Sequence, residues 1–405
     1  MLGAQAEKLL KTLEGLTRKE RHADILRHVK HQMLRGDLRL ERLVWAYGRH
    51  VNRTIANLGS VFEDHGYALE RFSMVVPRWR KLPAMMMSAR WQDGRLRGYS
   101  SIHPWTYRHL RVPKTLAEIP VLVFGDMILS DAPHFFYQDL NFQTIIDHRV
   151  GGIRTFMYDQ VPLSILHTQA RVQAERYARA KTVFVMSHWI KEAIVATGSI
   201  PAQRVQVVGA GSNLGVQFTS NPYTEANLDA KRLVFVGRDF ERKGGPLLLE
   251  AWDQVHRWIP DAQLVLVGPD PAFSNPAQHI TSLGDLPAAS VVALFLHSTG
   301  FVLPTLWEPY GIAFLEAFSC GVPGIGPNRM AIGEFLVDRH NGYLYERDDP
   351  SQIAEAMARL LKDREHTWAM SHGAFEESRE YTWDRVYQKM SETLTALRDP
   401  LPSRP

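Results

Sequence analysis

The stretch LPTLWEPYGIAFLEAFSCGVPGIG, residues 303–326, decides the fold because it joins a buried strand to a helix. The apolar run Gly300 to Pro304 is short and ends at a proline, which predicts a buried strand followed by a loop. An apolar-periodic segment begins at Gly311, which predicts a helix. We therefore expect Glu308 in the loop before this helix and Glu316 about one turn inside it.

The two glutamates flank one predicted helix N-terminus. Its free N–H groups and partial positive charge suit a phosphate, and carboxylates accept hydrogen bonds from sugar hydroxyls. A nucleotide sugar carries both kinds of group. The alternative is that Glu308 is a solvated loop residue and that Glu316 only complements the helix dipole.

A second strand–glycine–helix unit lies upstream in RLVFVGRDFERKGGPLLLEAW, residues 232–252. The strand is predicted to end at Gly237, and Arg238 and Lys243 follow before the helix. Glycines allow close backbone approach to a ligand, and the two cations can neutralise a diphosphate. Both units therefore predict a phosphate site at the carboxyl ends of strands.

Residues 230–385 resemble the retaining glycosyltransferases of family 4, because seven motifs follow one another in the order found in that family. The motifs are VFVGR with Lys243, LVLVGP, HITSLGDLP, FVLPTLWEPYG, EAFSCGVPGIG, NGYLYERDDP and YTWDRV. The resemblance implies the GT-B architecture, an α/β fold in which two Rossmann-like doubly wound domains face a cleft.

The expected domains are an acceptor-binding domain at 1–220, a nucleotide-sugar-binding domain at 221–385, and a crossover helix with its tail at 386–405. Leucines at helical spacing between residues 4 and 34 predict extra N-terminal helices.

The expected strands of the first domain are 42–48, 70–76, 120–127, 134–142, 182–187 and 204–208, with a helix at 52–64. A polar, turn-rich linker is expected after Gly211, and the last helix at 383–397.

By the same resemblance, Arg238 and Lys243 hold the donor diphosphate, Glu308 contacts sugar hydroxyls and Glu316 binds the ribose. The resemblance implies donor-binding positions at Gly48, Gly237, Arg238, Lys243, Pro309, Tyr310, Gly311, Ile312 and Glu316. Gly48 is the only glycine of the loop AYGRHVNR, where relatives commonly have a glycine-rich loop, so this part departs from the family pattern.

Catalysis must stabilise a departing nucleoside diphosphate. No Asp-x-Asp occurs in the sequence, so we expect no metal and no cofactor, with Glu308, Arg238 and Lys243 in catalytic roles. In HFFYQDLNFQ, Asp139 interrupts a strand-like run near where relatives carry a polar residue facing the donor sugar. Asp139 is the candidate group from the first domain, and the alternative is an Asp that only ends a strand.

Composition agrees with a folded enzyme. The chain has 405 residues, 45% of them hydrophobic and 22% charged, and the sequence shows neither a signal-peptide core nor a membrane-spanning apolar run. These features predict a cytoplasmic protein. Its single cysteine, Cys320, excludes an internal disulfide, and its position predicts a small buried side chain.

Residues 71–114 contain ten Arg or Lys residues and one acid, Asp93, interleaved with aromatic residues. Such a stretch suits an anionic or aromatic acceptor, or peripheral contact with the inner face of the membrane. The alternative is an ordinary basic surface whose aromatic residues are core. The net charge is only +4 and no nucleic-acid module occurs, so nucleic acid is not an expected partner.

The functional hypothesis is a retaining, metal-independent hexosyltransferase that uses a nucleoside diphosphate sugar. A phosphorylase or epimerase on the same architecture is one alternative, because fold alone does not determine chemistry. An inactive nucleotide-sugar-binding or scaffold subunit is another.

Overall fold

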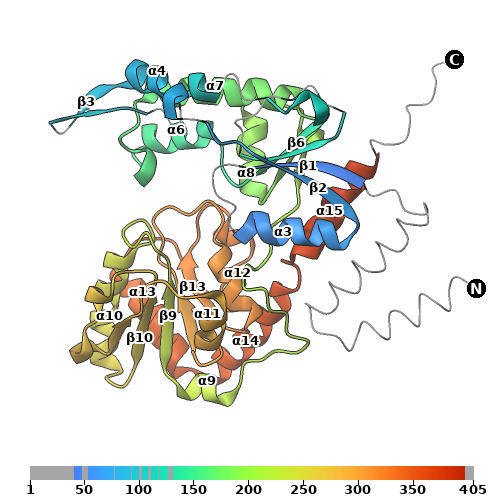
Figure 1. Cartoon of the computed structure of the whole chain (residues 1–405). Coiled ribbons are helices and arrows are strands. Elements are labelled where there is room, and N and C mark those ends of the chain that lie inside the picture. Colours follow the sequence, from blue (N-terminus) through green and yellow to red (C-terminus); the bar gives the residue numbers. More distant parts are fainter. Residues whose placement is uncertain are drawn as a thin grey trace, which may run out of the picture.

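The computed structural model describes residues 41–47, 53–76, 78–92, 94–99, 103–107, 111–116, 118–125, 130 and 132–396. These residues form two α/β domains, each built on a six-stranded parallel sheet (Figure 1). The predicted architecture of two Rossmann-like domains is therefore confirmed. The helices predicted between residues 4 and 34, and Gly48, lie outside the described residues.

The N-terminal sheet has the strand order β2-β1-β5-β6-β7-β8. Its strands are β1 Glu41–Tyr47, β2 Tyr67–Ser73, β5 Val121–Phe124, β6 His134–Gln138, β7 Thr182–Val185 and β8 Val205–Val207. The helices that accompany it are α3 Arg53–Asp64, α6 Phe142–Val150, α7 Leu163–Arg179 and α8 His188–Ala196. β5 and β7 are buried along their whole length, which explains why parallel strands appear as continuous apolar runs.

Two predicted strand boundaries in this domain were wrong. β2 begins at Tyr67, three residues earlier than expected, because its whole length pairs with β1 in parallel register. β6 ends at Gln138 and does not reach Phe142, because Asn141 starts α6 by accepting a hydrogen bond from the Thr144 N–H. The strands predicted at 120–127 and 300–304 are also shorter than expected.

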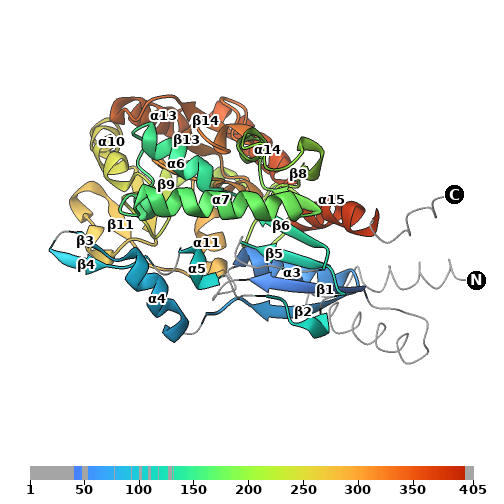
Figure 2. The ribbon, with the colours of Figure 1, turned by 90° about the horizontal axis from the view of Figure 1, so that it is seen from above.

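The connection between β2 and β5 contains a small substructure. It consists of α4 Arg78–Ser88, the antiparallel hairpin of β3 Arg90–Gln92 and β4 Arg95–Arg97, and the short helix α5 Pro104–Tyr107. In both ribbon views, α4 and the hairpin extend from the N-terminal domain on the side away from the last helix (Figures 1 and 2).

The C-terminal sheet has the order β11-β10-β9-β12-β13-β14. Its strands are β9 Arg232–Val236, β10 Gln263–Val267, β11 Ile280–Ser282, β12 Gly300–Val302, β13 Gly324–Pro327 and β14 Gly342–Tyr345. Its helices are α9 Glu225–Asp229, α10 Gly245–Trp258, α11 Ala288–Phe295, α12 Ile312–Ser319, α13 Pro350–Lys362 and α14 Arg364–Ser378. The chain reverses its winding direction between β9 and β12, and ligands of doubly wound sheets bind at such a switch point.

The last helix, α15 Trp383–Ala396, leaves the C-terminal domain and packs against α3 (Figure 1). The ring of Tyr387 lies 4.0 Å from that of His65, measured between centroids, and meets Phe62 edge-on. The Trp383 indole N–H donates to the carbonyl of Ser212 over 2.9 Å. The polar, turn-rich segment after Gly211, which was expected to be the linker, contains α9.

Of the helices that the structure describes, none has the length and hydropathy needed to cross a bilayer.

The two tryptophans of α10 provide a test of the C-terminal core. Trp252 is fully buried and its indole N–H donates to the carbonyl of Gln278, whereas Trp258 on the same helix is 44% exposed. We expect Trp252→Ala to lower the free energy of unfolding by about 3–5 kcal/mol, and Trp258→Ala to change it by less than about 1 kcal/mol. Urea unfolding followed by circular dichroism measures both, and equal midpoints would contradict this packing.

Candidate active site

An ion pair between Lys243 and Glu308 lies at the switch point of the C-terminal sheet. Lys243 follows β9 and Glu308 follows β12, and the Nζ and Oε2 atoms are 2.9 Å apart. Both side chains are largely buried, with 15% and 14% exposed. The structure therefore brings together two predicted site residues that are 65 positions apart in sequence.

Two glycines make this pairing sterically possible. A Cβ on Gly237 would lie 2.1 Å from Cδ of Lys243, so the lysine can cross the end of β9 only over a glycine. Gly244 has a φ of +75°, and a Cβ there would lie 1.7 Å from the carbonyl oxygen of Pro304. The loop after β9 thus packs directly on the loop after β12.

Arg242 belongs to this cluster, although the sequence analysis did not select it. Its guanidinium donates to the carbonyl of Trp307 over 2.7 Å and lies 3.3 Å from Glu308 Oε2. It also pairs with Asp239 on its own loop. The sequence signal was its position beside Lys243, which is weak because adjacent side chains usually diverge.

Arg238 occupies a different place. Its side chain is 82% exposed and pairs with Asp285 over 2.8 Å. The structure therefore does not bring Arg238 into contact with the Lys243–Glu308 pair; it lies on the exposed rim of the same sheet edge.

The pKa values of the carboxyl groups differ because their neighbours differ. Burial alone would raise the pKa of Glu308, but Lys243 and Arg242 outweigh it and hold that pKa below its ordinary value. Asp139 comes directly after β6 in the N-terminal domain. The Asp139 side chain is exposed to solvent, but nearby protein atoms partly desolvate its carboxyl group and, with repulsion from Glu308, raise its pKa. Asp139 and Glu308 thus come within electrostatic range across the two domains.

Glu316 lies in α12 where the two domains approach each other. Burial raises the pKa of Glu316 to about 7, opposed by Arg53 at the start of α3, by Lys243 and by the backbone of Asn213. Arg53 is a site neighbour that sequence reasoning missed. Near neutral pH, the Glu316 carboxyl group is therefore a mixture of ionised and neutral forms.

The predicted helix N-terminus is present at α12. Gly311 is its N-cap and has a φ of +101°, a conformation that favours glycine, and Ile312 is the first helical residue. Pro309 and Ile312 are partly exposed, whereas Tyr310 is buried and its hydroxyl accepts a hydrogen bond from the Ala210 N–H over 3.2 Å. The free N–H groups of α12 are thus placed on the same sheet edge as Lys243.

The domains also contact each other around the site. The Trp307 indole N–H donates to Nδ1 of His148 over 3.0 Å, and Arg154 pairs with Glu241 over 2.9 Å. A cavity of about 470 Å³ opens beside these contacts, and residues of both domains line it, among them His148 and Arg329. This cavity therefore lies between the two domains, and neither Lys243 nor Glu308 is among the residues that line it.

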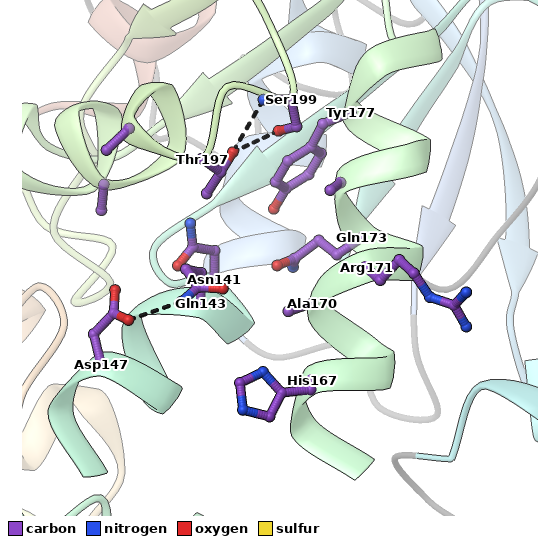
Figure 3. Close-up of a pocket in the computed structure, with 13 residues that line it drawn as sticks. Asn141, Gln143, Asp147, His167, Ala170, Arg171, Gln173, Tyr177, Thr197 and Ser199 are labelled. Atoms are coloured by element: carbon purple, nitrogen blue, oxygen red, sulfur yellow. Dashed lines mark hydrogen bonds between the residues drawn. The ribbon is translucent and has the colours of Figure 1, made fainter. Parts of the chain in front are cut away.

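Another cavity, of about 520 Å³, lies within the N-terminal domain between α6, α7 and α8 (Figure 3). Asn141, Asp147 and His167 are among its lining residues, and the lining includes no predicted site residue. It is separate from the Lys243–Glu308 pair.

Within the described part of the chain, no group of three or more His, Cys, Asp or Glu side chains has the arrangement of a metal site.

Comparison with known proteins finds a family similarity in the C-terminal half of the chain. Residues 218–377 match the model of glycosyl transferases group 1. Alpha-maltose-1-phosphate synthase of Mycolicibacterium smegmatis is 26% identical over 246 residues, which cover 53% of this chain and 62% of that protein. The chain spans about half the length of other curated relatives that it matches, 48% and 52% of two of them.

Solved structures are similar over most of the chain. Sucrose-phosphate synthase from Thermosynechococcus elongatus has a TM-score of 0.61 at 17% identity, covering 88% of this chain and 99% of that one. HepE from Anabaena, solved with UDP-glucose, has a TM-score of 0.57 at 14% identity, with 88% and 99% covered. Residues 218–377 thus resemble the glycosyl transferases group 1 family, and the chain as a whole has the two-domain GT-B fold.

Proposed function

We propose that the protein transfers a hexosyl group from a nucleoside diphosphate sugar to an acceptor hydroxyl with retention of anomeric configuration. One observation carries the proposal: the buried Lys243–Glu308 pair at the switch point, beside the N-terminus of α12. This arrangement offers a cation and N–H donors to a diphosphate, and a carboxylate acceptor to sugar hydroxyls.

In the proposed complex, Lys243 and the free N–H groups of α12 hold the diphosphate. Lys243 has three N–H donors, so it can contact phosphate while it keeps its bond to Glu308. Glu308 stays ionised because its pKa is lowered, and it accepts hydrogen bonds from the sugar. The ribose hydroxyls donate to Glu316.

In the transfer step, the acceptor oxygen attacks the anomeric carbon while the bond from that carbon to the diphosphate oxygen breaks. The acceptor proton passes to the departing phosphate on the same face of the sugar, so the products are a glycoside and a nucleoside diphosphate. Lys243, Arg242 and the α12 N-terminus stabilise the charge that develops on the leaving group. Asp139, in electrostatic range of Glu308, is proposed to orient the sugar from the opposite domain.

The donor is proposed to be a UDP-hexose. HepE, which has the same fold, was solved with UDP-glucose, and this likeness supports testing UDP donors first. We also propose that transfer needs no metal ion, because Lys243, Arg242 and the N–H groups of α12 would supply the positive charge that a metal otherwise brings to a diphosphate.

Lys243→Ala tests the site directly. The substitution removes a cation from the proposed diphosphate position, so we expect turnover to fall about 100-fold or more and UDP affinity, measured by calorimetry, to weaken. Lys362→Ala removes an exposed lysine at the end of α13 and is the matched control. UDP binding and UDP-hexose consumption at the wild-type level in Lys243→Ala would contradict the proposal. Tight UDP binding by the wild type without turnover of any donor would favour the inactive subunit.

The raised pKa of Glu316 predicts a pH dependence. An ionised carboxylate accepts more hydrogen bonds than the neutral acid, so ribose binding favours the ionised form. UDP affinity should then rise as the pH increases through about 7 and be lost as the pH falls through it. Calorimetry across this range measures the slope, and Glu316→Gln should flatten it while the exposed control Glu355→Gln keeps it. An unchanged slope in Glu316→Gln would exclude this role.

The metal proposal is tested by chelation. After dialysis against EDTA, we expect the rate of UDP-hexose consumption to stay within about twofold of the untreated enzyme, because the charge stabilisation comes from the protein. A large loss that Mg²⁺ or Mn²⁺ restores would overturn metal independence and leave the transferase assignment in place.

A further inference from the structure

Large apolar side chains are exposed on α4 and on the β3–β4 hairpin. Trp79, Met86, Trp91 and Leu96 are 65%, 75%, 74% and 68% exposed. Leu82, Met85 and Met87 are also exposed. Single exposed apolar side chains are ordinary on a protein surface. Exposed apolar side chains that are concentrated on consecutive elements instead indicate an interaction site. We call residues 78–92 and 94–97 the α4–hairpin surface.

The spacing of these residues explains why one face of α4 is apolar and exposed. Trp79, Leu82 and Met86 follow one another at intervals of three and four residues, which places them on the same side of the helix. Ala84 and Ser88 are buried and share another side, and the Ser88 hydroxyl is anchored to the carbonyl of Ala84. The helix thus packs through its small residues and presents its large ones to solvent.

The surface is strongly basic. Residues 78–97 contain six Arg or Lys residues and one acid, Asp93. The side chains of Arg78 and Arg95 are exposed, and within the described residues no acidic side chain forms an ion pair with either of them. An anionic partner would therefore meet Arg78 and Arg95 without competition from the acidic side chains that the structure describes.

The surface is also prominent and firmly attached. In both ribbon views α4 and the hairpin reach beyond the N-terminal sheet (Figures 1 and 2). Tyr99, two residues after β4, donates its backbone N–H to the Ser88 hydroxyl and its own hydroxyl to the carbonyl of Gln160. Its ring packs against the apolar cluster that contains Trp307 of the candidate active site.

We propose that the α4–hairpin surface docks the protein on an anionic lipid bilayer. Trp, Leu and Met side chains enter the boundary between headgroups and acyl chains, and Arg side chains extend to the lipid phosphates. A bilayer satisfies both groups without a complementary shape, which suits a projecting surface that carries apolar and cationic side chains together. This inference goes beyond sugar transfer and does not depend on it.

Vesicle flotation of the full chain tests the proposal. The probes are vesicles of phosphatidylcholine alone and of phosphatidylcholine with phosphatidylglycerol, at low and high salt. We expect binding to the anionic vesicles, weakened by salt. The triple variant Trp79→Ala, Trp91→Ala and Leu96→Ser should bind about tenfold more weakly, and so should Arg78→Glu with Arg95→Glu.

Matched controls come from the exposed surface of the C-terminal domain. Trp258→Ala with Leu283→Ser removes apolar side chains, and Arg257→Glu with Arg347→Glu reverses charges, so neither pair should change flotation. All changed residues lie outside the candidate active site, and the far-UV circular dichroism spectrum and urea midpoint of each variant, compared with those of the wild type, report correct folding.

Three results would overturn docking on lipid. The first is absence of wild-type binding to anionic vesicles, and the second is wild-type binding by both α4–hairpin variants. The third is a wild-type dimer, seen by light scattering, that the apolar variant converts to a monomer while vesicle binding is unchanged; the surface would then bind a second copy of the chain.

Discussion

The contact between Lys243 and Glu308 is the constraint on which the site depends. Burying two charges is costly unless they pair closely and their remaining hydrogen-bond donors and acceptors also find partners. Here the pairing is enforced from several directions: Gly237 leaves room for the lysine chain, and Arg242 adds a second cation and binds the Trp307 carbonyl. The loops after β9 and β12 are thereby held together at the switch point, and the helix that follows the second loop is positioned with them.

Positive charge gathers around the Glu308 carboxylate. Two cations converge on Glu308, and the N-terminus of α12 adds partial positive charge. The pKa values of the three carboxyl groups shift in different directions, because Glu308 has cations in contact whereas the pKa values of Asp139 and Glu316 are raised mainly by desolvation. In the proposed complex, the diphosphate would add negative charge where Lys243, Arg242 and the N-terminus of α12 supply positive charge.

The N-terminal domain contributes both to the cleft and to a separate outer surface. Contacts such as that between Trp307 and His148 keep the domains together beside the site, and α15 ties the end of the chain back to α3. The connection from β2 to β5 instead forms α4 and the β3–β4 hairpin, which are not part of the six-stranded sheet. The N-terminal domain thus contacts the candidate active site at one edge of its sheet. Away from that edge it carries the basic and apolar α4–hairpin surface.

The sequence by itself determined the two α/β domains, the order of the elements around residues 230–385 and the loop positions of Lys243 and Glu308. These follow from local patterns: apolar runs, glycines at strand ends and helical periodicity. The tertiary structure decided which side chains meet. It placed Arg242 on Glu308, left Arg238 on the rim and brought Asp139 into range from the other domain, because such contacts depend on strand order and domain packing, which no local pattern encodes.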